Sequence, residues 1–180
     1  AKSTYISLLL PSFYLANFPK NSILAATHSV EFAQRWGRRV RNDIQAERLV
    51  LGIEPATDSQ AADRWALTSG GEYYGVGAGV GISGYRADFG LIDDPFGSRE
   101  DAFSELVRKK RWEWYLSDFS ARLKPRAKRV IMHTRWHEED IAGRVEQQIE
   151  AGIVKGKVVS IPAIAIEDDL LGRQPGEYLW

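Results

Sequence analysis

The sequence predicts an α/β fold with three layers, in which helices cover both faces of a mostly parallel sheet. Short apolar segments bounded by turn residues, which suit buried strands, alternate along the chain with longer segments of helical periodicity. This alternation favours parallel pairing, because parallel strands are joined by crossover connections. The chain has 180 residues, 44% of them hydrophobic and 27% charged, so it is long enough to bury the core of one domain.

The predicted helices are placed by apolar spacing and by capping residues. They cover residues 4–15, 30–45, 98–123 and 138–151. Ser29 can cap the second helix, and Ser98 with Asp101 resembles a capping box that opens the third. The first helix is strongly apolar and ends near Asn17 and Pro19.

The predicted strands are short and lie between these helices. They cover residues 22–28, 64–67, 72–76, 87–93, 129–134 and 157–161. The second and third form a hairpin across Ser69-Gly70-Gly71. Residues 53–63 are expected to be a polar loop. Residues 75–84 are rich in glycine, and because a strand rather than a helix follows them, we interpret them as a flexible loop and not as a dinucleotide-binding turn.

Composition limits the possible partners and chemistry. The 24 basic and 24 acidic side chains give a net charge of zero, so any DNA is held by a local patch or by other subunits. Cysteine is absent, which excludes disulfides and thiolate metal sites and fits a reducing compartment. No apolar run approaches the length of a bilayer span, and no secretory leader is expected.

The first residues are interpreted as the second half of a phosphate-binding loop. Ala1-Lys2-Ser3-Thr4 precedes an apolar helix, and the amides at a helix N-terminus attract phosphate. In such a loop Lys2 reaches the β- and γ-phosphates and Ser3 ligates Mg²⁺. Lys2, Ser3 and Thr4 are therefore the candidate nucleotide-binding residues. The tetrapeptide by itself favours an ordinary chain terminus, so the interpretation depends on the motifs that follow.

Two acids follow a predicted buried strand, as in a Walker B segment. The strand Phe89-Gly-Leu-Ile runs directly into Asp93 and Asp94. It places the acids at the carboxyl edge of the sheet, where open α/β folds bind nucleotides. Asp93 is the candidate Mg²⁺ ligand, and Asp94 is the candidate for polarising the attacking water. The alternative is a plain Asp-Asp-Pro turn after a strand.

Thr134 is the candidate sensor of the γ-phosphate. It ends the predicted strand 129–134, and a polar residue at the end of the strand beside Walker B has this role in P-loop motors. The acids Glu138, Glu139 and Asp140 then begin a helix and complement its dipole. The two interpretations are compatible.

Taken together, these motifs resemble the ATPase domain of phage large terminases. The resemblance runs essentially from end to end, and the block beginning Thr134-Arg-Trp-His is its most specific part. The segments that carry it are Lys2-Ser3-Thr4, Trp65 with residues 68–77, and residues 82–88, 91–95, 134–144 and 171–180.

The resemblance implies a P-loop NTPase fold of the additional-strand, catalytic-acid type, in which hydrolysis of ATP with Mg²⁺ drives double-stranded DNA into a procapsid. The implied partners are DNA, the portal protein, the small terminase subunit and further copies in a homo-oligomeric ring, in the cytoplasm of a bacterial host and without a membrane. Residues 1–166 would be the ATPase core, and residues 167–180 a connector toward a C-terminal nuclease domain. The first strand and the loop glycines would precede Ala1, which stands where the family pattern has glycine.

The resemblance also implies an arginine supplied across the subunit interface, which neutralises charge on the transferring phosphoryl group. Arg86, just upstream of the acid-bearing strand, is the first choice, and Arg39 and Arg41 are the alternatives. Asp94 departs from the many relatives that carry Glu, which shortens its reach to water by one methylene.

Three other functions stay open. A helicase-like ATPase is disfavoured because no second RecA-like domain is evident. A metal-dependent nuclease would join Asp93 and Asp94 to further carboxylates, for which Asp88, Glu138 and Asp140 are the candidates. An assembly module with a degenerate ATP site is the non-enzymatic possibility.

Two weaker signals are interpreted as structural. The basic run at residues 108–111 is followed by Trp112 and Trp114, but the apolar spacing around it favours an amphipathic helix whose cations face solvent. His133 and His137 have the spacing of helical metal ligands, yet a strand-to-helix junction is expected between them, so zinc is not expected.

Overall fold

A computed structural model describes residues 2–179 and contains one mixed, mostly parallel sheet of six strands. The strand order is β2-β3-β4-β1-β5-β6. Strands β4, β1, β5 and β6 are parallel, and the β2–β3 and β3–β4 pairs are antiparallel. The strands are β1 (Ser22–Thr27), β2 (Pro55–Gln60), β3 (Arg64–Leu67), β4 (Glu72–Gly77), β5 (Ala87–Asp93) and β6 (Leu123–Met132).

Helices form in all four predicted regions, with one interruption, and the short helix α3 (Arg48–Leu51) was not predicted. Ser29 and Ser98 cap helices as expected, accepting the Phe32 amide at 3.3 Å and the Asp101 amide at 3.1 Å. The long helix expected after Ser98 breaks at Ser104, which caps a second helix. The helical segments are η1 (Thr4–Leu9), α1 (Leu10–Asn17), α2 (Val30–Ala46), α3 (Arg48–Leu51), α4 (Arg99–Phe103), α5 (Glu105–Trp114), η2 (Tyr115–Phe119), η3 (Ser120–Arg122) and α6 (Ile141–Glu150).

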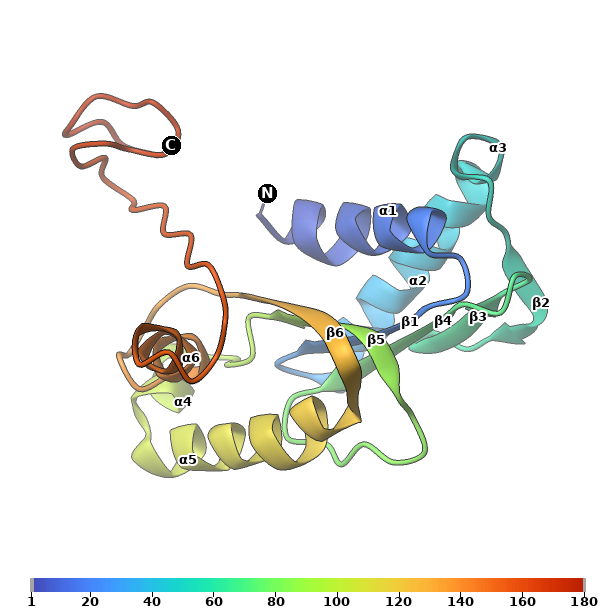
Figure 1. Ribbon diagram of the computed structural model, residues 1–180, viewed down its shortest axis with the longest axis horizontal. Coiled ribbons are helices and arrows are strands. Elements are labelled where there is room, and N and C mark those ends of the chain that lie inside the picture. Colours follow the sequence, from blue (N-terminus) through green and yellow to red (C-terminus); the bar gives the residue numbers. More distant parts are fainter. Residues whose placement is uncertain (1, 180) are drawn as a thin grey trace. The chain divides into compact units, whose positions relative to one another are not determined.

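Helices cover both faces of the sheet, which confirms the predicted α/β layering (Figure 1). Glycines in the strands allow this close packing. A β-carbon at Gly75 would lie 3.1 Å from the Ala33 carbonyl oxygen on α2, and one at Gly90 would lie 3.1 Å from the Phe119 ring on η2. The α1–α2 layer therefore packs on one face and the α5–η2 segment on the other.

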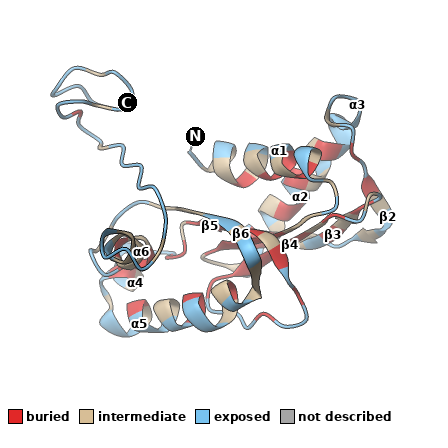
Figure 2. Ribbon diagram, viewed as in Figure 1, coloured by how far each residue is buried: buried red, intermediate tan, exposed pale blue. Residues whose placement is uncertain are grey.

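The main core lies between the sheet and the α1–α2 layer, where Figure 2 shows the inner strands as buried. The Trp65 and Tyr73 rings stack at 5.1 Å, and the Trp65 indole nitrogen donates to the Gly37 carbonyl at 3.0 Å. This bond satisfies the polar end of a fully buried aromatic residue and fixes α2 over β3.

Two whole segments differ from their predicted structure, and β6 (Leu123–Met132) starts and ends earlier than the predicted strand 129–134. Residues 55–60, expected to be a polar loop, form the edge strand β2, which tolerates polar residues because one side faces solvent and Pro55 is its first residue. Residues 157–161, expected to be a strand, have no strand partner among the described residues. Val159 is 61% exposed there, and an unpaired apolar segment does not hold a strand by itself.

The chain forms two compact units, Ala1–Arg144 and Val145–Trp180. The first holds the sheet. The second is mainly irregular, with one antiparallel bridge between Ile164 and Tyr178 and a close Asp169–Arg173 ion pair at 2.7 Å. The predicted boundary between a core (1–166) and a connector (167–180) stays a prediction.

Ala1 and Trp180 lie outside the described residues, so the predicted loop position of Ala1 and the end of the predicted connector have no structural description. Among residues 2–179, no helix has the length and apolar character that crossing a bilayer requires.

Candidate functional site

The carboxyl ends of three parallel strands meet at one edge of the sheet. Thr27 at the end of β1 pairs with Asp93 at the end of β5, and Asp93 pairs with Met132 at the end of β6. Residues that directly follow β5 and β6 therefore emerge side by side. Asp94 and Thr134 leave the sheet at this edge, where open α/β folds place their ligands.

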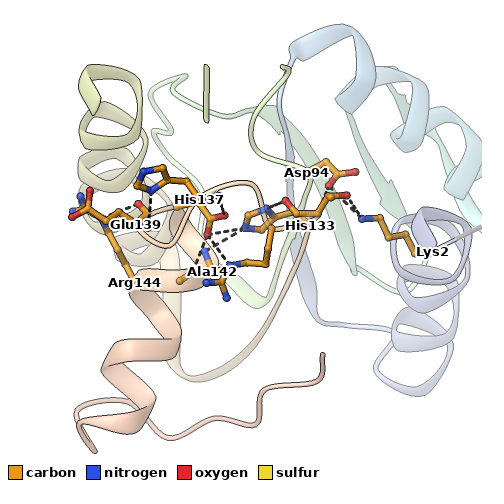
Figure 3. Close-up of polar contacts among 11 residues, drawn as sticks. Lys2, Asp94, His133, His137, Glu139, Ala142 and Arg144 are labelled. Carbon is orange, nitrogen blue, oxygen red and sulfur yellow. Dashed lines mark hydrogen bonds and ion pairs between the residues drawn. The ribbon is translucent and has the colours of Figure 1, made fainter. Parts of the chain in front are cut away.

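The first helix brings the predicted phosphate-binding residues to the same edge. Lys2 donates from its ammonium group to the Thr134 hydroxyl at 2.6 Å and lies 3.8 Å from an Asp94 carboxylate oxygen (Figure 3). Ser3 donates to the Asp93 carboxylate at 3.4 Å. Three segments far apart in the sequence thus converge, and five predicted site residues contact one another.

Asp94 adopts a backbone conformation that is uncommon for a residue with a side chain. Its φ angle is 44°, in the left-handed region that aspartate tolerates better than most residues. Its amide donates to the Met132 carbonyl at 3.0 Å, and its carboxylate accepts the Thr134 amide at 3.1 Å. The turn after β5 is thereby held against the end of β6, with the Asp94 side chain 40% exposed.

Asp93 is buried, in contrast to its neighbour. It is 4% exposed and accepts a short hydrogen bond of 2.5 Å from the Ser7 hydroxyl. Burial raises the pKa of the Asp93 carboxyl; the Ser7 hydrogen bond opposes this rise, and the nearby charge of Asp94 adds to it. A bound cation would relieve this cost of burying a charge.

Ser7 was missed in the sequence. It lies one helical turn after Ser3, so both hydroxyls face the sheet edge from the same side of η1. The spacing of two serines in an otherwise apolar helix was a readable signal, because the helix could have placed Ala or Leu at either position. Ser7, Trp36, Tyr73 and Asp93 are among the residues that line a small cavity beside the acid.

The oxygen donors at this edge fit a magnesium ion. Mg²⁺ prefers oxygen ligands, commonly one or two carboxylates together with waters and phosphates. The Asp93 carboxylate and the Ser3 hydroxyl are such donors, and Ser7 adds a third oxygen. No cluster of three or more His, Cys, Asp or Glu side chains that could hold a metal occurs among residues 2–179.

The remaining predicted residues lie apart from this cluster. Thr4 begins η1 and makes no described contact with the acids. Arg86 is exposed at the opposite end of β5, roughly 20 Å from Asp93 at the rise of a strand. Arg41 donates to backbone carbonyls at the end of β2, including that of Gln60, so it is held within its own chain. Arg39 is exposed on α2.

A buried network behind Thr134 was also missed. Asp140 is 1% exposed and accepts the Gly143 amide at 2.9 Å, which caps the start of α6. His133 lies 3.4 Å from the same carboxylate, and Arg135 lies 3.7 Å from it. Figure 3 shows His133 between the Lys2–Asp94 pair and the turn that carries His137.

This network ties the loop after β6 to the helix that follows. Burial works against ionisation of Asp140, but the hydrogen bond and charge of His133, the Gly143 amide and Arg135 outweigh it, so the pKa of Asp140 lies below its usual value. A shallow pocket beside the network is lined by residues from the loops after β5 and β6, among them Asp94, Phe96 and Thr134. Sequence spacing predicted Glu138, Glu139 and Asp140 as dipole partners but not the contact of Asp140 with His133.

Comparison with models of protein families and with curated protein sequences found no match to this chain.

Proposed function

We propose that this chain carries the nucleotide site of a P-loop ATPase of the additional-strand, catalytic-acid type. One observation supports this most: Lys2, Ser3 and the acid pair with Thr134, which the sequence separates by up to 132 positions, lie within contact distance at the carboxyl edge of a parallel sheet. A helix N-terminus, a lysine, hydroxyl groups and two acids with different exposure are the groups that phosphoryl transfer requires.

The residues divide the chemistry between them. Lys2 binds the β- and γ-phosphate oxygens of ATP, and its contact with Thr134 is exchanged for them when the nucleotide binds. Ser3 and Asp93 hold Mg²⁺, with Ser7 orienting the carboxylate through its hydrogen bond. Bound Mg²⁺ neutralises charge on the phosphate oxygens during transfer. Thr4 contributes its amide to the phosphate cradle at the helix start.

Asp94 and Thr134 act on the side of the γ-phosphate from which the water attacks. The Asp94 carboxylate is accessible, unlike that of Asp93, and its turn is fixed by the Met132 carbonyl and the Thr134 amide. It orients and polarises the attacking water, and Thr134 responds to the γ-phosphate. Arg86 belongs to this scheme only as a residue supplied to the site of a neighbouring subunit, because it lies at the far end of β5 in its own chain.

The biological setting that best suits this site is a viral large terminase, in which ATP hydrolysis translocates double-stranded DNA into a procapsid. This part of the proposal rests on the resemblance of the motifs described above. It brings with it a homo-oligomeric ring, a portal protein, a small terminase subunit and the cytoplasm of a bacterial host.

A metal-dependent nuclease is the second possibility, and the placement of the other carboxylates disfavours it. Asp88 lies toward the opposite end of β5 and is paired with Lys124 at 2.8 Å. Asp140 is committed to His133 and to the start of α6. Neither joins Asp93 and Asp94, so neither supplies a ligand to a second metal there, and residues 2–179 contain no cluster of three or more metal-binding His, Cys, Asp or Glu side chains.

The test is Mg²⁺-dependent ATP hydrolysis by the natural polypeptide that carries these residues. We expect Asp93→Asn and Lys2→Ala to lower the turnover number by about 100-fold or more, since the first removes the charge proposed to hold Mg²⁺ and the second the charge proposed to bind the phosphates. The matched controls are Asp88→Asn, on the same strand, and Lys20→Ala, an exposed lysine, which should retain most of the activity. Unchanged turnover in both site variants would contradict the proposal, and Mg²⁺-dependent DNA cleavage lost with Asp93→Asn would favour the nuclease.

A further inference from the structure

Helix α2 presents an exposed face rich in arginine. Its buried face is formed by Ala33, Gly37, Val40 and Ile44, at helical spacing. The opposite face carries the exposed Arg35, Arg38 and Arg39. A chain with no net charge has therefore gathered three cations on about one turn of a single helix.

No ion pair among the described residues neutralises the arginines of this face. None of the three arginines forms an ion pair among residues 2–179. Two carboxylates lie on the helix. Glu31 is exposed one helical turn before Arg35 but forms no ion pair with it among the described residues, and Asp43 is half-buried and accepts the Ser12 hydroxyl at 2.7 Å. With Glu31 counted, the face keeps a positive charge that is available to an external partner.

Two of the arginines are stacked on aromatic rings of the same helix. The Arg39 guanidinium lies 4.7 Å from the Trp36 ring centre, and that of Arg35 lies 5.9 Å from the Phe32 ring centre. A stacked guanidinium is held in place while its N–H edges stay free to donate. Such an edge matches two oxygens of a phosphate group.

The spacing suits a nucleic-acid backbone. Arg35 and Arg39 are one helical turn apart, which is about 6 Å along the helix. Each strand of duplex DNA carries one phosphate per about 3.4 Å of its axis, so the two arginines are spaced to meet phosphates about two steps apart on one strand. Trp36 also lines the cavity beside Asp93, so the arginine face starts next to the candidate nucleotide site.

We propose that this arginine face (Arg35, Arg38 and Arg39 on α2) binds the phosphate backbone of double-stranded DNA. The inference deepens the proposed function, since the choice of DNA as the polyanion rests on it. The contacts are to phosphates, so binding is independent of base sequence. The affinity falls as the salt concentration rises, because the release of counterions from DNA is then less favourable.

The experiment measures binding of the chain to a fluorescent duplex of about 30 random base pairs, without nucleotide, across about 0.05–0.3 M NaCl. Arg35→Gln/Arg39→Gln is compared with Lys109→Gln/Lys110→Gln, which removes the same charge from exposed positions on α5. Each lost phosphate contact lowers the slope of log K against log salt by about 0.9. We expect the arginine variant to lose about 1.8 in slope and about 10- to 100-fold in affinity near 0.1 M salt, and the lysine variant to keep the slope of the unmodified chain.

Equal losses in the two variants, or no loss in the arginine variant, would overturn the proposal. Displacement of the duplex by polyglutamate as readily as by unlabelled DNA would also overturn it and would favour an acidic protein partner. All four side chains are exposed, so we expect both variants to fold. Circular dichroism checks this. ATP hydrolysis is not measured here, so a failure of DNA binding leaves the nucleotide site to its own test.

Discussion

At the scale of single residues, Asp93 and Asp94 are adjacent in sequence and opposite in environment. Asp93 ends a buried strand and receives hydroxyl donors from Ser3 and Ser7, with no ion pair among the described residues. Asp94 turns out of the sheet with a left-handed backbone and faces Lys2. This difference in environment is why the proposed function assigns the cation to Asp93 and the attacking water to Asp94.

Replacement of Asp93 by Asn should stabilise the fold while it disables the site. Because the pKa of Asp93 is raised in the folded chain, its ionised form weakens folding above that pKa, and this penalty disappears as pH falls below the unfolded value of 3.8. We expect the melting temperature of Asp93→Asn, measured without Mg²⁺, to exceed that of the unmodified chain at pH 7 by a few degrees, at about 2–4 °C per kcal/mol. The difference should vanish near pH 3.

The control is Asp94→Asn, whose carboxylate is exposed and should leave the melting temperature nearly unchanged. A fall in the melting temperature of Asp93→Asn at pH 7 would mean that the buried carboxylate stabilises the fold without a metal. That result would contradict the view that ionised Asp93 weakens folding.

At the scale of elements, the site depends on two loops that follow β5 and β6. The sequence predicted β5 to the residue, at 87–93, because its apolar segment at 89–92 ends in two acids and Pro95. It placed the end of β6 two residues too late, at Thr134, although the strand ends at Met132. That error has a tertiary cause: Thr134 binds Asp94 and Lys2 and not a neighbouring strand.

The sequence predicted helix caps better than it predicted strand pairing. Ser29 and Ser98 cap helices through contacts within three residues, which sequence spacing captures. The strand β2 depends on pairing with β3, and for that reason residues 53–63 looked like a loop. The break at Ser104 is a local cap on the Val107 amide, at 3.5 Å, that the longer predicted helix passed over.

Asp140 should stabilise the loop after β6 and the start of α6 together. Asp140→Ala removes the cap on Gly143 and leaves buried His133 without its carboxylate, so we expect a loss of about 2–4 kcal/mol in the free energy of unfolding at pH 7. Because the pKa of Asp140 is lowered, its contribution is present above the unfolded value of 3.8 and is lost as pH falls below it. Urea unfolding at pH 7 and at pH 3 measures both effects.

Asp140→Asn is the matched variant, since asparagine also caps helices but carries no charge. It should recover the part of the loss that belongs to the cap. If Asp140→Ala unfolds at the same urea concentration as the unmodified chain, the network does not hold the loop.

At the scale of the whole molecule, long-range contacts assemble the candidate site. The sequence predicted which residues take part because each motif sits at a strand end or a helix start, and parallel strands bring their carboxyl ends to one edge. It missed Ser7, which reaches Asp93 through helix geometry, and it missed the contact of Asp140 with His133 behind the site. Arg86 shows the limit of sequence order: it precedes the acids closely in the chain but lies at the other end of the strand.

The most direct test of the nucleotide site is to bind Mn²⁺ with a non-hydrolysable ATP analogue and record paramagnetic broadening of the backbone amide signals across the chain. We expect strong broadening at Ser3, Ser7, Asp94 and Thr134, its loss in Asp93→Asn, and unaffected signals at Arg86, which lies at the far end of β5. Broadening centred on any other region, or broadening at these residues that survives Asp93→Asn, would contradict a nucleotide–metal site at this edge of the sheet.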